Sequence, residues 1–183
     1  MKNDELDISK ETYSGFIKLA GYQIIGGAIG IAIIIWLVHK AEVLNAGDIL
    51  LLTLMILLFA YSFFCGVRLI QAKAGALKLS LINQCLQVIG FSAMGFAFNY
   101  VAGLYLTTEF DLADTLKVNF GFGISKFALR INSDADTTAF SINIIAVLVI
   151  FWIIKLMQKV NTEIELDKAA TIGTDITSES IDK

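Results

Sequence analysis

Few residues in this sequence are of the types that catalyse reactions or bind metals. His39 is the only histidine, and the two cysteines, Cys65 and Cys85, both lie in apolar stretches. A catalytic triad or a histidine-based metal cluster needs more such side chains than one chain of this composition supplies. We interpret the two cysteines as buried structural residues. The sequence therefore predicts no catalytic residue, no metal site and no cofactor.

Acidic side chains are the next group with possible chemistry, since a cluster of carboxylates can bind calcium. Five of them lie in the segment 107–139: Glu109, Asp111, Asp114, Asp134 and Asp136. The stretch 132–136, Asn-Ser-Asp-Ala-Asp, lacks the glycine and the bidentate glutamate of a calcium-binding loop. We therefore expect these carboxylates to be solvated turn residues.

Amide and hydroxyl side chains interrupt a long apolar run over residues 77–106. Ser80, Asn83 and Gln87 are spaced so that they share one face of a helix, and Asn99 lies farther along the run. Such side chains either make hydrogen bonds to a neighbouring helix or line a water-filled vestibule. We favour helix packing, because amides commonly serve as contacts between membrane helices.

Glycines mark places where two elements could approach closely. Gly26 and Gly30 form a small-xxx-small pattern, and Gly95 and Gly103 lie on one helical stripe with Asn99. Without a Cβ atom, the backbones of two neighbouring elements can touch. For Gly26 and Gly30 we favour packing within the chain over a dimer contact.

These residues belong to a chain with the composition of a membrane protein. Of its 183 residues, 56% are hydrophobic and 17% are charged, and the mean hydropathy is +0.72; soluble domains carry about 25% charged residues. Four apolar runs are long enough to cross a bilayer: 15–38, 49–70, 77–106 and 140–158. The sequence predicts an all-α integral membrane protein, with an antiparallel bundle of four transmembrane helices in a membrane domain over residues 15–158.

The interiors of these runs argue against several mechanisms. Residues 19–38, 49–67, 79–106 and 140–154 contain no Asp, Glu, Lys, Arg or His. Proton relays and voltage sensors use such residues within the membrane, so neither mechanism is favoured. The net charge of −3, from 14 basic and 17 acidic residues, also argues against a nucleic-acid partner.

The outer loop, residues 107–139, changes from a helical to an alternating pattern. Alternate positions are apolar: Leu116, Val118, Phe120, Phe122 and Ile124. This spacing is typical of a strand, and it slips by one residue after Ser125 and Lys126, which a hairpin or a bulged strand would explain. We expect a small extracytoplasmic β-hairpin between the third and fourth helices. This outer ribbon would pack as a lid on its own bundle or, as a less favoured arrangement, on another copy.

Lysine and arginine are unevenly distributed along the predicted topology. Ten of the 14 lie in or close to the N-terminal segment, the turn between the second and third runs, or the segment that follows the fourth run. Cytoplasmic segments retain such an excess, so both termini should be cytoplasmic. We expect a cytoplasmic N-terminal segment over residues 1–14 and a disordered cytoplasmic tail over residues 159–183. Helical spans indicate a plasma membrane or a bacterial inner membrane.

No motif in the sequence specifies a reaction, so the functional prediction rests on the membrane architecture. We expect a non-enzymatic scaffold, or an accessory or regulatory subunit of a membrane complex. Its partners would be the lipid bilayer and other membrane proteins or further copies of itself. The alternative is a homo-oligomeric pore or channel lined by Ser80, Asn83 and Gln87. A membrane enzyme acting on lipid through Arg68, Lys73 and Lys78 is the third and least favoured function.

Overall fold

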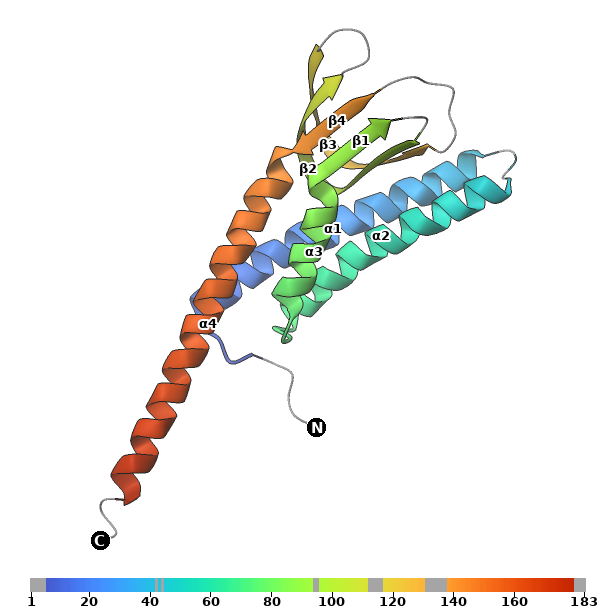
Figure 1. Cartoon of the computed structure of the whole chain (residues 1–183). Helices are drawn as coiled ribbons and strands as arrows, with labels where there is room; N and C mark the ends of the chain where they lie inside the picture. The colour runs from blue at the N-terminus through green and yellow to red at the C-terminus, as the bar shows by residue number, and fades with distance from the viewer. Residues whose placement is uncertain are drawn as a thin grey trace.

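The computed structural model describes residues 6–41, 43, 45–93, 96–111, 117–130 and 138–179. Within these ranges it contains four helices and four strands (Figure 1). In chain order they are α1 Lys10–Lys40, α2 Ala46–Ile70, α3 Ala76–Val88, β1 Ile89–Ala93, β2 Phe96–Asp111, β3 Lys117–Arg130, β4 Ala139–Asn143 and α4 Ile144–Glu179.

Helices α1 and α2 form a long hairpin (Figure 1). The Ser9 side chain accepts a hydrogen bond from the Thr12 N–H at the start of α1, and a capping box of Asn45 and Asp48 starts α2. Both caps satisfy N–H groups that have no partner in the first turn of a helix. In length and composition α1, α2 and the Ile144–Ala170 part of α4 are each able to cross a membrane. Three of the four predicted apolar runs therefore coincide with long helices.

The predicted third membrane helix, residues 77–106, is wrong. Helix α3 ends at Val88, and the chain continues as β1 and β2. The reason lies in Phe96, Phe98 and Tyr100, because aromatic residues at alternate positions favour a strand. The 13 residues of α3 extend only about 20 Å, which is shorter than a hydrocarbon core of about 30 Å. A four-stranded sheet thus replaces the small hairpin and the outer half of the predicted helix.

A bend in β2 closes part of this sheet into a ring. Residues 96–98 of β2 pair with β1, residues 107–111 of β2 pair with β4, and β1 also pairs with β4, always antiparallel. Two strands that both run antiparallel to a straight third strand would run parallel to each other. Strand β2 therefore changes direction between its two ends, and these ends close a ring with β1 and β4. Strand β3 pairs along the other edge of β2.

The change of direction coincides with a β-bulge. The register of β2 and β3 shifts between Val101 and Leu104, so that Ala102 and Gly103 lie opposite Ser125 alone. Gly103 has a φ of 120° and Ser125 a φ of 49°. Left-handed backbone is available to glycine without strain, and Ser125 is held by two hydrogen bonds of its side chain. The slip in the sequence pattern after Ser125 is thus a bulged strand, one of the two predicted explanations.

The register divides the sheet into two faces, because paired residues share a face and alternate residues lie on opposite faces. The inner face is turned into the ring and carries small, polar and charged residues: Gly90, Ser92, Asn99, Thr107, Glu109, Asp111, Lys126, Ser141 and Asn143. The outer face is apolar and includes Phe91, Phe98, Leu104, Leu106, Val118, Phe120, Phe122, Ile124, Phe140 and Ile142. In strands with this alternation, the apolar outer face can contact lipid or other apolar side chains while the polar face is turned inward.

Two apolar clusters join the elements. In the first, Tyr100 and Ala102 of β2 pack on the α1–α2 hairpin, and the Tyr100 ring meets the Phe59 ring edge-on with centroids 5.4 Å apart. The second cluster connects α4 and α3 with the first half of α1 through Phe16, Leu19, Leu77, Ile153 and Leu156. The sheet is therefore seated on the hairpin and is not an isolated ribbon.

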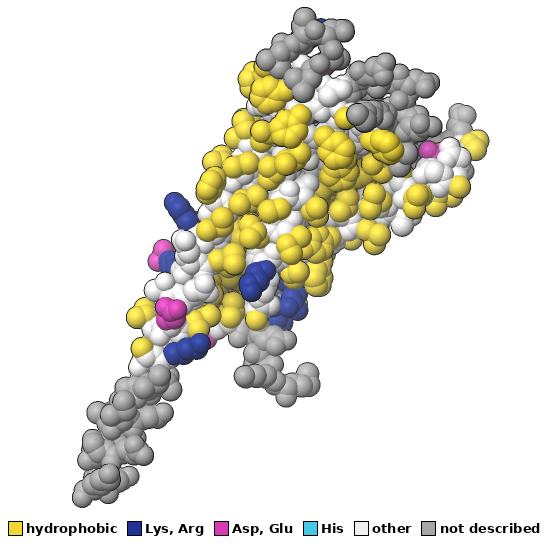
Figure 2. Space-filling view, viewed as in Figure 1, with side chains coloured by type: hydrophobic (Ala, Val, Ile, Leu, Met, Phe, Trp, Pro, Cys, Tyr) yellow, Lys and Arg dark blue, Asp and Glu magenta, His cyan; other side chains and the backbone are white. Residues whose placement is uncertain are grey.

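Most charged side chains visible in Figure 2 lie at the end of the helices remote from the sheet. There the hydroxyls of Ser9 and Thr12 each donate to Glu163 at 2.6 Å, and Lys159 Nζ lies 2.7 Å from Glu11 Oε1. These contacts place the N-terminal segment beside α4. Helix α4 continues to Glu179, where the sequence predicted a disordered tail from residue 159. The chain contains no proline that would end this helix.

Candidate functional site

Hydrogen-bonding side chains from three helices meet in the apolar interior. Ser80 and Asn83 of α3 are completely buried within one copy of the chain. Asn83 Nδ2 donates to Ser62 Oγ at 3.1 Å, and Ser80 Oγ donates to Gln23 Oε1 at 3.3 Å. Ser62 Oγ in turn donates to the backbone oxygen of Gln23 at 3.2 Å. These contacts join α3 to α1 and α2 through side chains.

The same cluster reaches the sheet through Tyr100 and Gln87. The Tyr100 hydroxyl donates toward the Leu58 carbonyl at 2.8 Å and toward Asn83 Oδ1 at 3.3 Å. Gln87 Oε1 accepts the Ala102 N–H at 2.9 Å. Strand β2 is therefore held by polar contacts exactly where it bends, in addition to its apolar contacts with the hairpin.

Several amide groups of this cluster lack partners. Within the described residues, neither polar atom of the Gln84 side chain makes a hydrogen bond, and the same is true of Nε2 of Gln23 and Gln87 and of Nδ2 of Asn143. A buried polar group without a partner costs about 1–3 kcal/mol, and buried water commonly supplies the missing bond. The cluster can therefore hold water, but these amides and hydroxyls do not ionise in the way that a proton relay requires.

Three of the four predicted close-packing glycines make tight contacts within the chain. A Cβ atom on Gly26 would lie 2.5 Å from the backbone of Ala102 and Gly103, and a Cβ atom on Gly30 would collide with the Phe59 ring. A Cβ atom on Gly103 would lie 2.7 Å from the Tyr22 ring. Strand β2 thus rests directly on α1 at Gly26, and α2 rests on α1 at Gly30. Gly95 is outside the described residues.

The predicted outer ribbon corresponds to the outer face of β3. Val118, Phe120, Phe122 and Ile124 are all exposed, and the two phenylalanines are 75% and 76% exposed. Leu116 is outside the described residues. Strand β3 pairs with β2 along one edge, and no strand in the described part of the chain covers its other edge. The ribbon touches its own bundle at the bulge, whereas its aromatic side chains point away from the bundle.

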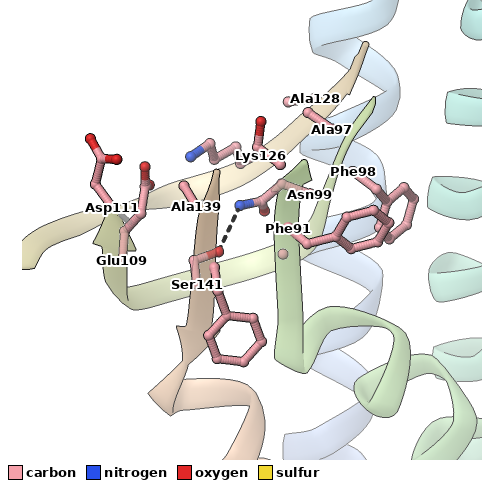
Figure 3. A pocket seen from close by; sticks show the side chains of 13 residues that line it. Phe91, Ala97, Phe98, Asn99, Glu109, Asp111, Lys126, Ala128, Ala139 and Ser141 are labelled. Atoms are coloured by element: carbon pink, nitrogen blue, oxygen red, sulfur yellow. Dashed lines mark hydrogen bonds between the residues drawn. The ribbon is translucent and has the colours of Figure 1, made fainter. Parts of the chain in front are cut away.

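A cavity of about 260 Å³ lies against the inner face of the sheet (Figure 3). All four strands contribute to it, including Gly90 of β1, Asn99 and Glu109 of β2, Lys126 of β3 and Ser141 of β4. Asn99 Nδ2 donates to Ser141 Oγ at 3.3 Å. A Cβ atom on Gly90 would lie 2.5 Å from Ser141 Oγ and 2.6 Å from Asn99 Nδ2. The glycine therefore leaves the room that these two side chains occupy.

Sequence reasoning assigned the residues of this cavity to other roles. Glu109 and Asp111 were expected to be solvated turn residues, yet they belong to β2 and line the cavity with Asn99. Lys126 lies at the slip in the strand pattern, which by itself predicts no cavity. The slip is the one feature of the sequence that places Lys126 on the inner face. The pattern does not show which strand pairs with β3. Asp114, Asp134 and Asp136 are outside the described residues.

The remaining reactive side chains are dispersed. Cys65 is buried as predicted, whereas Cys85 is exposed on α3, and both are free thiols. His39 ends α1 at the tip of the hairpin. Glu163 lies beyond the apolar part of α4. Desolvation raises its pKa, but hydrogen bonds from Ser9 and Thr12 outweigh this effect and hold the pKa below its usual value.

Comparison of the chain with protein-family models, with curated proteins and with solved structures gives no match. The described residues offer three features for function. These are the partly satisfied polar cluster among the helices, the open edge of β3 and the charged cavity inside the ring of strands.

Proposed function

We propose that this chain is a non-enzymatic, multi-pass membrane protein that serves as a scaffold or accessory subunit of a membrane complex. Its three long apolar helices support a membrane location. The concentration of lysine and arginine at the end of the helices remote from the sheet supports cytoplasmic termini in a plasma or bacterial inner membrane. The partners are the lipid bilayer and a neighbouring membrane subunit.

The position of β3 beside α1 carries this proposal. Ser125 Oγ, in the middle of β3, donates to the Gly26 carbonyl at 3.0 Å. Gly26 lies within the uncharged stretch 19–38 of α1. At about 1.5 Å per residue, Gly26 is about 10 Å from the start of that stretch and about 18 Å from its end. An α1 helix that crosses a bilayer therefore carries the middle of β3 at the depth of the hydrocarbon core.

An open strand edge is unfavourable at that depth. Hydrocarbon offers no hydrogen bonds to backbone N–H and C=O groups, so strand edges there must be paired or covered. Within the described residues the outer edge of β3 is uncovered. We infer that a strand of a neighbouring subunit pairs with β3 and extends the sheet. The exposed apolar side chains of β3 would then pack at the subunit contact or against lipid.

The other two functions have less support. Ser80, Asn83 and Gln87, the expected lining of a pore between copies, are buried inside one copy. For an enzyme acting on lipid, the expected basic cluster lies at the turn between α2 and α3. There the Arg68 guanidinium donates to the Ala74 carbonyl at 3.4 Å, which is a structural role within the turn.

Native mass spectrometry of the full chain, extracted in a mild detergent from its native membrane, tests this proposal. We expect a complex that contains a second copy or another subunit in fixed stoichiometry. Two variants then locate the contact. Phe122→Ala removes a ring from β3 that is 76% exposed, and Phe151→Ala removes one from α4 that is 61% exposed.

The proposal requires Phe122→Ala to lower the fraction of complex while Phe151→Ala leaves it unchanged. A chain that is extracted as a monomer with lipid alone contradicts the proposal. Equal losses in the two variants contradict it as well, because they would reflect a general loss of apolar surface. A closed homo-oligomer that conducts ions in planar bilayers would instead favour the pore.

A further inference from the structure

Two opposite charges face the sheet cavity without neutralising each other. Glu109 belongs to β2 and Lys126 to β3, and both line the cavity. In the part of the chain that the structure describes, neither side chain makes an ion pair or a hydrogen bond. Figure 3 shows these two side chains and that of Asp111 extending to the same side of the strands. Among the described residues, Glu109 and Lys126 therefore give the cavity one unpaired anion and one unpaired cation.

The backbone fixes where these groups lie. Glu109 is the cross-strand neighbour of Ser141 on β4, and Asn99 is the cross-strand neighbour of Ala128, two residues beyond Lys126 on β3. Each position is set by strand pairing and not by a loop. Charged groups held in this way are available to a ligand without a large ordering cost.

Neither a simple anion nor a simple cation suits this set of charges. An anion beside Lys126 would be repelled by the carboxylate of Glu109, and a cation beside Glu109 would be repelled by Lys126. A ligand that carries both charges can pair with Glu109 and with Lys126, and these contacts offset the cost of removing the charges from water.

We propose that the cavity binds a small zwitterion, with its ammonium group against Glu109 and its carboxylate or phosphate against Lys126. A volume of about 260 Å³ corresponds to roughly nine water molecules at about 30 Å³ each. This volume suits an amino acid or a phosphoethanolamine group and is smaller than most pockets for drug-sized ligands. The ligand is therefore either a soluble zwitterion or the headgroup of an aminophospholipid. The inner face that binds it is separate from the outer edge of β3 that is proposed to pair with a partner.

Calorimetry on the full chain in phosphatidylcholine nanodiscs tests the zwitterion. The probes are O-phosphoethanolamine and β-alanine, with inorganic phosphate and ethanolamine as singly functional comparisons. We expect at least one zwitterion to bind more tightly than both comparisons. Lys126→Gln and Glu109→Gln should each weaken this binding by about tenfold or more, the loss of one charge-assisted hydrogen bond. The matched control is Lys40→Gln, which removes an exposed lysine at the end of α1, away from the cavity, and should change nothing.

Two further arms complete the test. The charge-swapped double variant, Glu109→Lys with Lys126→Glu, should restore binding, because a zwitterion can enter in the reversed orientation. Native mass spectrometry after reconstitution with mixed phosphatidylethanolamine and phosphatidylcholine then identifies the source. Selective retention of phosphatidylethanolamine, lost in Lys126→Gln and Glu109→Gln, assigns the site to a headgroup. Binding of the soluble probes without lipid retention assigns it to a free zwitterion.

The proposal is overturned when neither source binds, or when phosphate or ethanolamine binds as tightly as the zwitterions. Equal effects of Lys126→Gln and Lys40→Gln would overturn it too. These results are distinguishable from failure of the assembly function, because that function is measured by the oligomeric state and by the Phe122→Ala and Phe151→Ala variants.

Discussion

The α1–α2 hairpin and the sheet place apolar side chains on their surfaces but pair their backbones differently. In the hairpin, the interior N–H and C=O groups are paired within each helix. In the sheet, the backbone is paired between strands, and β3 keeps an open edge in the described structure. A helix is thus complete without a neighbour, whereas the last strand of a sheet is not. The sheet is therefore the region at which we propose that a partner binds.

The two regions also differ in how they use polar side chains. In the hairpin, Gln23 and Ser62 are buried and engaged in contacts between elements. In the sheet, Glu109 and Lys126 face a cavity and have no partner in the described structure. Polar groups in the first region hold the fold together, and those in the second are available to a ligand.

We expect the largest loss of stability from a substitution at Gly26, where the sheet rests on the α1–α2 hairpin. In Gly26→Ala the new Cβ atom would lie 2.5 Å from the backbone of Ala102 and Gly103, which cannot rotate away as a side chain could. We expect a loss of about 3 kcal/mol in unfolding free energy, at the upper end for overpacking. Denaturant titration in detergent micelles measures it. Gly21→Ala is the control, because nothing lies within 4 Å of its added Cβ atom. Equal stability of the two variants would show that the sheet does not rest on α1.

We expect a smaller loss of stability when the polar contact between the sheet and the hairpin is removed. Tyr100→Phe removes a buried hydroxyl that donates toward Leu58 and Asn83. The carbonyl oxygens would lose a donor, and we expect a cost of about 1.5 kcal/mol in the same titration. Tyr105→Phe, on the same strand, serves as the control because its hydroxyl has no hydrogen bond within the described residues. A loss no greater than that of the control would mean that the apolar contacts alone hold β2 on the hairpin.

The next substitution should change stability in the opposite direction. Gln84 is completely buried, and within the described residues its amide has no partner. Gln84→Leu should therefore raise the unfolding free energy by about 1 kcal/mol, since it removes an unsatisfied polar group. Asn83→Leu is the matched comparison and should lower stability, because Asn83 is bonded to Ser62 and Tyr100. A destabilised Gln84→Leu variant would show that bound water satisfies the amide.

The smallest effect concerns the end of the helices remote from the sheet. The pKa of Glu163 is depressed in the fold, so its carboxylate contributes stability above the pKa of the unfolded chain and loses it as the pH falls through the folded pKa. Wild-type protein should have a slightly higher Tm than Glu163→Gln at neutral pH, and the gap should close on acidification. A gap that is constant with pH would mean that Glu163 acts through its hydrogen bonds and not through its charge.

Hydropathy predicted the long helices well, because length and the absence of charge are sufficient to define them. Hydropathy did not predict that helix α3 ends at Val88 and that strand β1 begins at Ile89. The run 77–106 is apolar throughout, but Phe96, Phe98 and Tyr100 recur with a period of two, which specifies a strand. In a strand with one apolar and one polar face, mean hydropathy stays high and hides the alternation.

The candidate site was less predictable than the fold. Ser80, Asn83 and Gln87 were found because one helix face brings them together, and local spacing reveals that. Glu109 and Lys126 line the same cavity because β2 pairs with both β3 and β4. Strand register is set by contacts across the fold, so no spacing within the sequence places these two charges in one cavity.

The junctions between helices and strands have a mechanical consequence. Val88 of α3 is followed directly by Ile89 of β1, and Asn143 of β4 is followed directly by Ile144 of α4, with no loop at either junction. Strands β1 and β4 are hydrogen-bonded to each other over residues 89–92 and 139–142. Because no loop lies at either junction, a change in the angle between α3 and α4 must make β1 and β4 slide along each other. These two strands form one wall of the cavity, so its shape would change as well.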